Sequence, residues 1–156
     1  MPKEIERKFL VTSEVFKSLG VKHYIHQGFL STDKERVVRI RIQDNKAFIT
    51  IKGKTEEATR SEFEYVIPLE DAQFMLENLC EKPTIEKYRY IIPYAGFTWE
   101  VDEFHGENAG LVIAEIELQH ENQEFQKPEW LGEEVTTDPR YYNANLVKHP
   151  YKSWKT

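Results

Sequence analysis

The sequence is poor in cysteine, in long apolar runs and in surplus positive charge, and each shortage excludes a class of protein. Cys80 is the only cysteine among 156 residues, so neither an intrachain disulfide nor a cysteine-rich zinc site can form. No apolar run approaches the length of a membrane span, and no apolar signal region follows the first residues. The formal net charge of -6 argues against general nucleic-acid binding. We therefore expect a cytoplasmic protein with no membrane and no nucleic-acid partner.

The composition is typical of one folded domain. Hydrophobic residues make up 40% of the chain and charged residues 31%, a balance that differs from that of disordered segments. A length of 156 residues is enough to bury a substantial core. No low-complexity linker and no internal repeat divides the chain, so we expect a single domain over residues 1–156.

Alternating apolar and polar residues predict eight strands. Alternate side chains of a strand share a face, so Glu4, Glu6 and Lys8 lie on the same side of the first strand, which continues into Phe9 to Val11. The other strands are expected over residues 24–30, 36–43, 46–54, 60–67, 84–92, 97–102 and 112–119. Helical spacing predicts short helices over residues 15–19, 72–79 and 138–148.

The polar faces of these strands carry charges that are sorted by sign. Basic residues stand at Arg39, Arg41, Lys52, Lys87 and Arg89, and acidic residues at Glu62, Glu64, Glu100, Asp102, Glu115 and Glu117. An antiparallel sheet with one solvated face would explain each strand taken alone. Eight strands can also close into a barrel, whose outer apolar faces the helices would then cover. With the charges inside such a barrel, a polyanion together with a divalent metal would satisfy both signs of charge.

Taken in order, these segments resemble the CYTH superfamily, the triphosphate tunnel metalloenzymes. The N-terminal segment Glu4-Ile5-Glu6-Arg7-Lys8 matches the Glu-x-Glu-x-Lys signature of that family. The later segments that match are Gln27-Gly28-Phe29-Leu30, Arg39-Ile40-Arg41, Thr50-Ile51-Lys52, Glu86-Lys87-Tyr88-Arg89-Tyr90 and Glu115-Ile116-Glu117. The resemblance implies an α+β fold in which an eight-stranded antiparallel β-barrel forms a tunnel with a charged interior, and a few helices pack outside.

The same resemblance implies roles for individual residues. The expected ligands of Mg²⁺ or Mn²⁺ are Glu4, Glu6, Glu115 and Glu117. The triphosphate would be bound by Lys8, Arg39, Arg41, Lys52, Lys87 and Arg89, and the expected catalytic residues are Glu4, Glu6, Lys8, Lys52 and Lys87. The remaining acidic residues, Glu62, Glu64, Glu100 and Asp102, either serve a second metal, position the attacking water or pair with the basic residues.

The activity implied by the resemblance is metal-dependent hydrolysis of inorganic tripolyphosphate to phosphate and diphosphate. An adenylyl cyclase or a thiamine or nucleoside triphosphatase would use the same residues on an organic triphosphate, and the short chain favours the inorganic substrate. An alternative of another class is a non-catalytic protein that binds polyphosphate or nucleotide. The partner we expect is a small-molecule triphosphate, with a homodimer as a further possibility.

Overall fold

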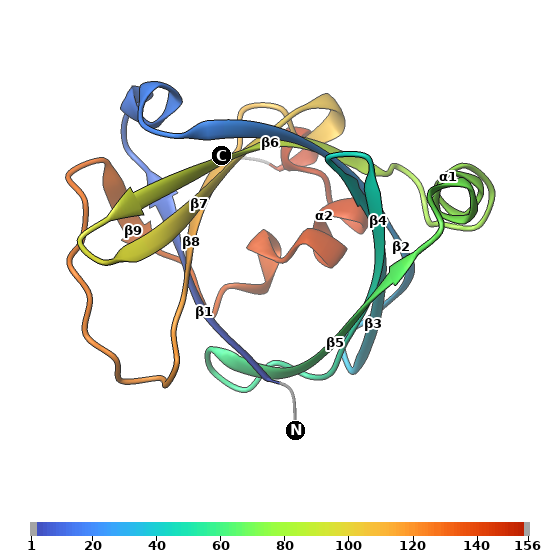
Figure 1. The fold of residues 1–156 in the computed structure, drawn as a ribbon, viewed down its shortest axis with the longest axis horizontal. Helices are drawn as coiled ribbons and strands as arrows, with labels where there is room; N and C mark the ends of the chain where they lie inside the picture. The colour runs from blue at the N-terminus through green and yellow to red at the C-terminus, as the bar shows by residue number, and fades with distance from the viewer. Residues whose placement is uncertain (1–2, 155–156) are drawn as a thin grey trace.

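The chain folds into a closed antiparallel barrel (Figure 1). The computed structural model describes residues 3–154. Eight strands are hydrogen-bonded in the order β5-β4-β3-β2-β6-β7-β8-β1, and β1 pairs back with β5, so that the sheet closes. The predicted eight-stranded antiparallel barrel is therefore confirmed. Its strands are β1 (Lys3–Val11), β2 (Val21–Asp33), β3 (Arg36–Gln43), β4 (Lys46–Lys52), β5 (Thr59–Ile67), β6 (Ile85–Tyr94), β7 (Phe97–Phe104) and β8 (Val112–Glu117).

A ninth strand, β9 (Leu131–Glu134), extends the sheet beside β1. β1 pairs with β5 only over residues 3–5, and further along it pairs with β9 at Phe9 and Val11. The sequence did not predict β9. Four residues are too few to show an alternating pattern, and the partner of β9 lies at the other end of the chain.

The strand register sends charged side chains into the barrel and apolar side chains outward. Residues directly opposite each other on neighbouring strands share a face, and Lys8 lies opposite Glu115 as Arg89 lies opposite Asp102. The outward-facing residues form two separate cores. One contains Phe9, Trp99, Val101, Ala114 and Ile116 and is covered by Leu118, Phe125 and Trp130. The other contains Ile40 and Ala47 and is covered by Ala72 and Leu76 of a helix.

The helix α1 (Leu69–Asn78) lies on the outer wall over β2, β3 and β4. It accounts for the predicted helix over residues 72–79, and its buried face carries Ala72 and Leu76. Gly28 in β2 allows this close packing, because a Cβ atom there would lie 2.9 Å from the Cβ of Cys80. A shorter 3-10 helix, η1 (Val15–Ser18), stands where the first helix was predicted.

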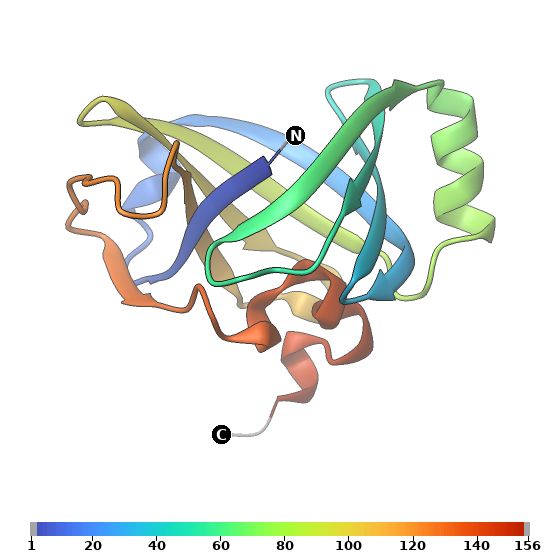
Figure 2. The same ribbon diagram turned by 90° about the horizontal axis from the view of Figure 1, so that it is seen from below.

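The C-terminal segment closes one end of the barrel (Figure 2). The single helix predicted over residues 138–148 is divided into the 3-10 helix η3 (Pro139–Tyr141) and the helix α2 (Asn143–Lys148), with Tyr142 in an extended conformation between them. The 3-10 helix η4 (Tyr151–Ser153) follows. Instead of covering the outer wall, α2 packs against apolar residues at this end; its Leu146 and Val147 share a core with Phe29, Val37, Ile85, Phe104 and Ile113.

The described part of the chain, residues 3–154, contains no helix that is long and apolar enough to span a membrane.

Candidate active site

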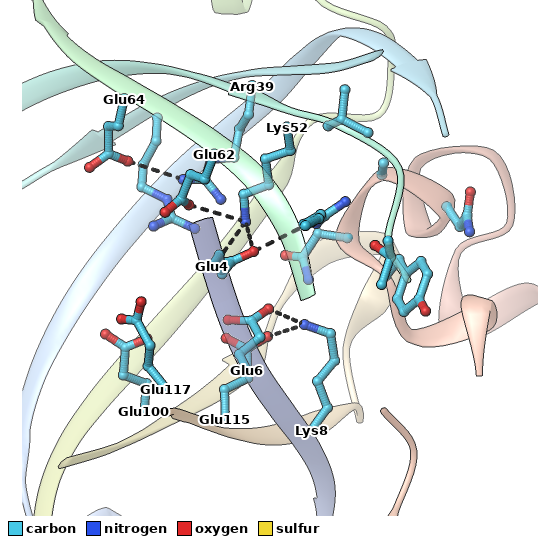
Figure 3. Close-up of a pocket in the computed structure, with 18 of the residues that line it drawn as sticks. Glu4, Glu6, Lys8, Arg39, Lys52, Glu62, Glu64, Glu100, Glu115 and Glu117 are labelled. Carbon is cyan, nitrogen blue, oxygen red and sulfur yellow. Dashed lines mark hydrogen bonds and ion pairs between the residues drawn. The ribbon is translucent and has the colours of Figure 1, made fainter. Parts of the chain in front are cut away.

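The barrel encloses a cavity of about 870 Å³. Inward side chains of the strands line it, together with residues of the segment 139–145, which enters from the closed end. Figure 3 shows how side chains from several strands converge there. Every site residue predicted from the sequence borders the cavity except Asp102. Those that do are Glu4, Glu6, Lys8, Arg39, Arg41, Lys52, Glu62, Glu64, Lys87, Arg89, Glu100, Glu115 and Glu117.

Two lysines on the cavity wall are held by carboxylates (Figure 3). Lys52 Nζ donates to both carboxylate oxygens of Glu4, each at 3.0 Å. Lys8 Nζ donates to Glu6 Oε1 at 2.5 Å and to Glu115 Oε2 at 2.6 Å. Burial alone would favour the neutral form of Glu4, but Lys52, Lys8 and a neighbouring guanidinium lower the pKa of Glu4 to about 2. The carboxylate of Glu4 is therefore ionised at neutral pH.

Asp102 lies behind the cavity wall as a buried counter-ion. Its carboxylate is 2.7 Å from Lys87 Nζ and accepts hydrogen bonds from Arg89 Nε at 2.7 Å and Arg89 Nη2 at 2.9 Å. The side chains of Asp102 and Lys87 are each only 2% exposed. Although burial opposes ionisation, Arg89 and Lys87 strongly lower the pKa of Asp102. We interpret Asp102 as the group that orients these two cations toward the cavity.

Arg41 is a cation on the cavity wall without a carboxylate partner. It makes no ion pair within residues 3–154, and its Nε donates to Gln27 Oε1 at 2.8 Å. Burial, and after it the guanidiniums of Arg39 and Arg89, lowers the pKa of Arg41, although a guanidinium stays protonated in proteins. Arg39 Nε is also buried, with no hydrogen-bond partner in the described chain, although Nη2 of the same guanidinium lies 3.4 Å from Glu64 Oε2. Positive charge that the protein itself leaves unbalanced indicates a site for an anion.

Four further carboxylates border the cavity, and three of them lie near cations: Glu62 Oε2 is 3.5 Å from Lys52 Nζ, Glu64 Oε2 is 3.4 Å from Arg39 Nη2 and Glu100 Oε1 is 3.3 Å from Arg89 Nη1. Burial, followed by the neighbouring carboxylates, raises the pKa of Glu117, which has no ion-pair partner in the part of the chain that the structure describes. Burial is also the largest cause of the raised pKa of Glu100 and of Glu62. Figure 3 shows Glu62 and Glu64 on one wall, and Glu100 and Glu117 together on another. Carboxylates that repel one another in this way are suited to a divalent cation.

The donor set at this site fits a hard divalent metal ion, because carboxylate oxygens are the ligands that such ions prefer. Among residues 3–154, no three carboxylate, histidine or cysteine side chains are already arranged to hold an ion. The reason is that Glu4, Glu6 and Glu115 are turned toward Lys52 and Lys8. An anion that bound these lysines would release the carboxylate oxygens for a metal.

Three residues of the site were not predicted from the sequence, namely Asn143, Gln27 and Arg60. Asn143 Oδ1 accepts hydrogen bonds from Lys87 Nζ and from Gln27 Nε2, both at 2.8 Å, and Gln27 is fully buried. Arg60 Nε lies 3.4 Å from Glu4 Oε1. Arg60 could have been found from the sequence, because it continues the inward row of Glu62 and Glu64. The residues around Asn143 show no pattern that predicts a site residue, because its position in the cavity depends on where α2 packs.

Comparison with known proteins agrees with this geometry. A family profile described as the CYTH domain matches residues 2–151. A protein named inorganic triphosphatase from Acetivibrio thermocellus is 55% identical over 155 residues, which cover 99% of each chain. A protein of the same name from Nitrosomonas europaea is 39% identical over 152 residues, 92% of this chain and 96% of the other. The crystal structure of the inorganic triphosphatase NE1496 superimposes with a TM-score of 0.67 at 35% identity, covering 94% of this chain and 95% of that one.

Proposed function

This chain belongs to the CYTH domain family, and on that premise we propose that it is a metal-dependent hydrolase that converts inorganic triphosphate to phosphate and diphosphate. Two relatives that align with almost the whole chain carry the name inorganic triphosphatase. The observation that carries the proposal is the cavity itself. Within residues 3–154 it combines a guanidinium that has no carboxylate partner, Arg41, with a carboxylate that has no ion-pair partner, Glu117. A ligand that brings both an anion and a cation would satisfy the two.

The cationic side chains would bind the phosphate oxygens. Guanidinium groups offer paired N–H donors that match two oxygens of a phosphoryl group, whereas the lysines act as point charges. When the triphosphate binds, Lys8 and Lys52 would exchange their carboxylate partners for phosphate oxygens. The complete set proposed for substrate binding is Lys8, Arg39, Arg41, Lys52, Lys87 and Arg89.

The carboxylates that this exchange releases would hold the metal. We assign Glu4, Glu6, Glu115 and Glu117 to an Mg²⁺ or Mn²⁺ ion. When bound, such an ion neutralises charge on the phosphate oxygens and acts as a Lewis acid. Glu62, Glu64 and Glu100 border the same cavity and would hold a second ion or orient the attacking water. Asp102, which lies behind Lys87 and Arg89, would serve this step only by positioning these two cations.

The reaction is an attack of water on a terminal phosphorus of the bound chain. A new P–O bond forms to the water oxygen, and the water gives up a proton to solvent. The bond to the bridging oxygen breaks, and its electron pair leaves with diphosphate. The catalytic residues would be Glu4, Glu6, Lys8, Lys52 and Lys87, which position the chain and balance charge. These two effects dominate the catalysis of phosphoryl transfer.

The test is release of phosphate from inorganic triphosphate, ATP and thiamine triphosphate, each with Mg²⁺, Mn²⁺ or a chelator. We expect metal-dependent turnover that is fastest with inorganic triphosphate. Glu4→Gln and Arg41→Ala should each lower kcat by about two to three orders of magnitude. Arg36→Ala, which changes an exposed arginine at the start of β3, and Glu70→Gln on α1 are the matched controls.

Each other outcome would indicate a different function for this protein. Faster turnover of ATP or thiamine triphosphate would favour an enzyme that acts on an organic triphosphate. Formation of cyclic AMP from ATP would favour a cyclase. Tight binding of inorganic triphosphate with no phosphate release under any condition would favour a binding protein.

A further inference from the structure

Asn143 reaches the cavity from the closed end of the barrel. It is the first residue of α2 and follows the extended Tyr142, so its side chain projects from the start of the helix into the cavity. It is half-buried, and it is joined to side chains of two different barrel strands, Gln27 of β2 and Lys87 of β6.

The hydrogen bonds fix the orientation of the Asn143 amide. Lys87 Nζ can only donate, and it meets Asn143 Oδ1 at 2.8 Å. Gln27 Oε1 accepts from Arg41 Nε, so the amide nitrogen of Gln27 must face Asn143, where it donates to the same Oδ1 at 2.8 Å. A flipped Asn143 would place its own N–H groups against two donors. The oxygen is therefore engaged, and the amide nitrogen points elsewhere.

The Nδ2 group of Asn143 makes no hydrogen bond within residues 3–154, and it is not among the buried unpaired polar atoms. Because the residue borders the cavity and its oxygen is turned to the wall, these N–H groups are the part left to face a ligand. The Oδ1 atom of the same amide is bonded to Lys87 and is linked through Gln27 to Arg41, and both of these cations belong to the cavity wall.

We propose that Asn143 contacts the substrate: its Nδ2 donates a hydrogen bond to a non-bridging oxygen of the phosphoryl group that Lys87 and Arg41 hold. This inference rests on the function proposed above, because it takes the ligand to be an inorganic triphosphate. It gives the C-terminal segment a direct part in the site. Asn143 would supply a neutral, oriented donor among cations that could bind the oxygens in several ways.

The main test is Asn143→Ala, with Asn78→Ala as the matched control. Asn78 ends α1 on the outer wall, does not border the cavity, and also loses a side-chain hydrogen bond, from its Nδ2 to Phe74 O at 3.1 Å. We expect Asn143→Ala to weaken binding of inorganic triphosphate roughly 10- to 100-fold, the range for a hydrogen bond to a charged group. The readouts are the dissociation constant by calorimetry, KM and kcat, and the thermal midpoint Tm. A change in Tm with unchanged affinity and KM would overturn the proposal and leave Asn143 a structural residue.

A double-mutant cycle with Lys87→Met separates direct contact from positioning. If Asn143 acted only by holding Lys87, then Asn143→Ala would have no further effect on triphosphate affinity once Lys87 is absent. Because Asn143 also holds Gln27, the partner of Arg41, the same cycle is made with Arg41→Ala. A loss that persists in both backgrounds supports direct contact, and a loss that disappears in either background overturns it. The proposed function fails separately, when the unchanged protein binds but does not hydrolyse inorganic triphosphate. If the unchanged protein does not bind inorganic triphosphate at all, both proposals fall.

Discussion

Asp102→Asn should destabilise the protein far more than a comparable change at the surface. The substitution keeps the shape of the side chain but removes its negative charge. The carboxylate oxygens that carry this charge lie 2.7 Å from Lys87 Nζ and 2.7 Å from Arg89 Nε. The side chains of Asp102, Lys87 and Arg89 are 2%, 2% and 8% exposed, so water replaces the lost carboxylate poorly. Arg89 keeps Glu100 and Glu115 at 3.3 and 3.7 Å, whereas Lys87 has no other ion-pair partner within residues 3–154. Removing one partner of a buried ion pair typically costs about 3–5 kcal/mol. Because two cations share Asp102, we expect a loss in this range.

The matched control is Glu103→Gln on the same strand. Glu103 is paired with Lys17 at 3.1 Å, but these side chains are 24% and 40% exposed, and such pairs contribute about 0–1 kcal/mol. The assay is the free energy of unfolding from denaturant titration, with and without inorganic triphosphate. The ligand should recover part of the loss in Asp102→Asn, because its charge would replace that of the missing carboxylate. Equal losses of stability in the two variants would refute the argument that Asp102 is a buried counter-ion.

Three further predictions follow from the site and its support. Metal affinity should fall as the pH is lowered toward 5, because the pKa of Glu117 is raised and a bound metal competes with protons for its carboxylate. The expected fall is up to about tenfold per pH unit for each proton displaced. Calorimetry at several pH values measures it, and a pH-independent affinity would contradict the prediction. Arg41→Lys should keep the charge but lose the planar fork, so KM for triphosphate should rise while Tm hardly changes; an unchanged KM would show that charge alone suffices. Leu76→Ala, on the buried face of α1, should cost about 2–5 kcal/mol of stability and leave KM unaltered, which denaturant titration and steady-state kinetics test together.

The charged rows could be predicted from the sequence because they depend on local geometry. A period of two determines which residues share a face, so the strands and the shared charged face from Glu4 to Glu117 follow from the printed order of residues. That this face lies inside a barrel was expected from the sorting of its charges by sign and from the family resemblance, because a solvated face would show the same period. The roles assigned to these residues, the choice of Mg²⁺ or Mn²⁺, the homodimer and the cytoplasmic location stay predictions.

The closed end could not be predicted from the same pattern. The position of α2 depends on contacts between residues distant in sequence, and a helix of six residues carries little signal of its own. One clue was present. Four inward rows end in an apolar residue at the same end of the barrel, namely Val37, Ile85, Phe104 and Ile113, and these residues form the core on which α2 packs. Asn143 and Gln27 became visible as site residues only after that packing was known.

The separation between core and cavity explains how a barrel with a charged interior remains stable. The apolar cores lie outside the strands and at the closed end, so apolar packing there, and not the ion pairs inside the cavity, holds the strands together. In the proposed function, pairs such as Lys52 with Glu4 would serve as temporary partners, because a bound triphosphate and metal would replace both members without exposing apolar surface. The exchange leaves no buried charge alone, which would otherwise cost several kcal/mol. Since the ligand binds only the folded barrel, it should add about 2.7 kcal/mol of stability at a hundred times its dissociation constant.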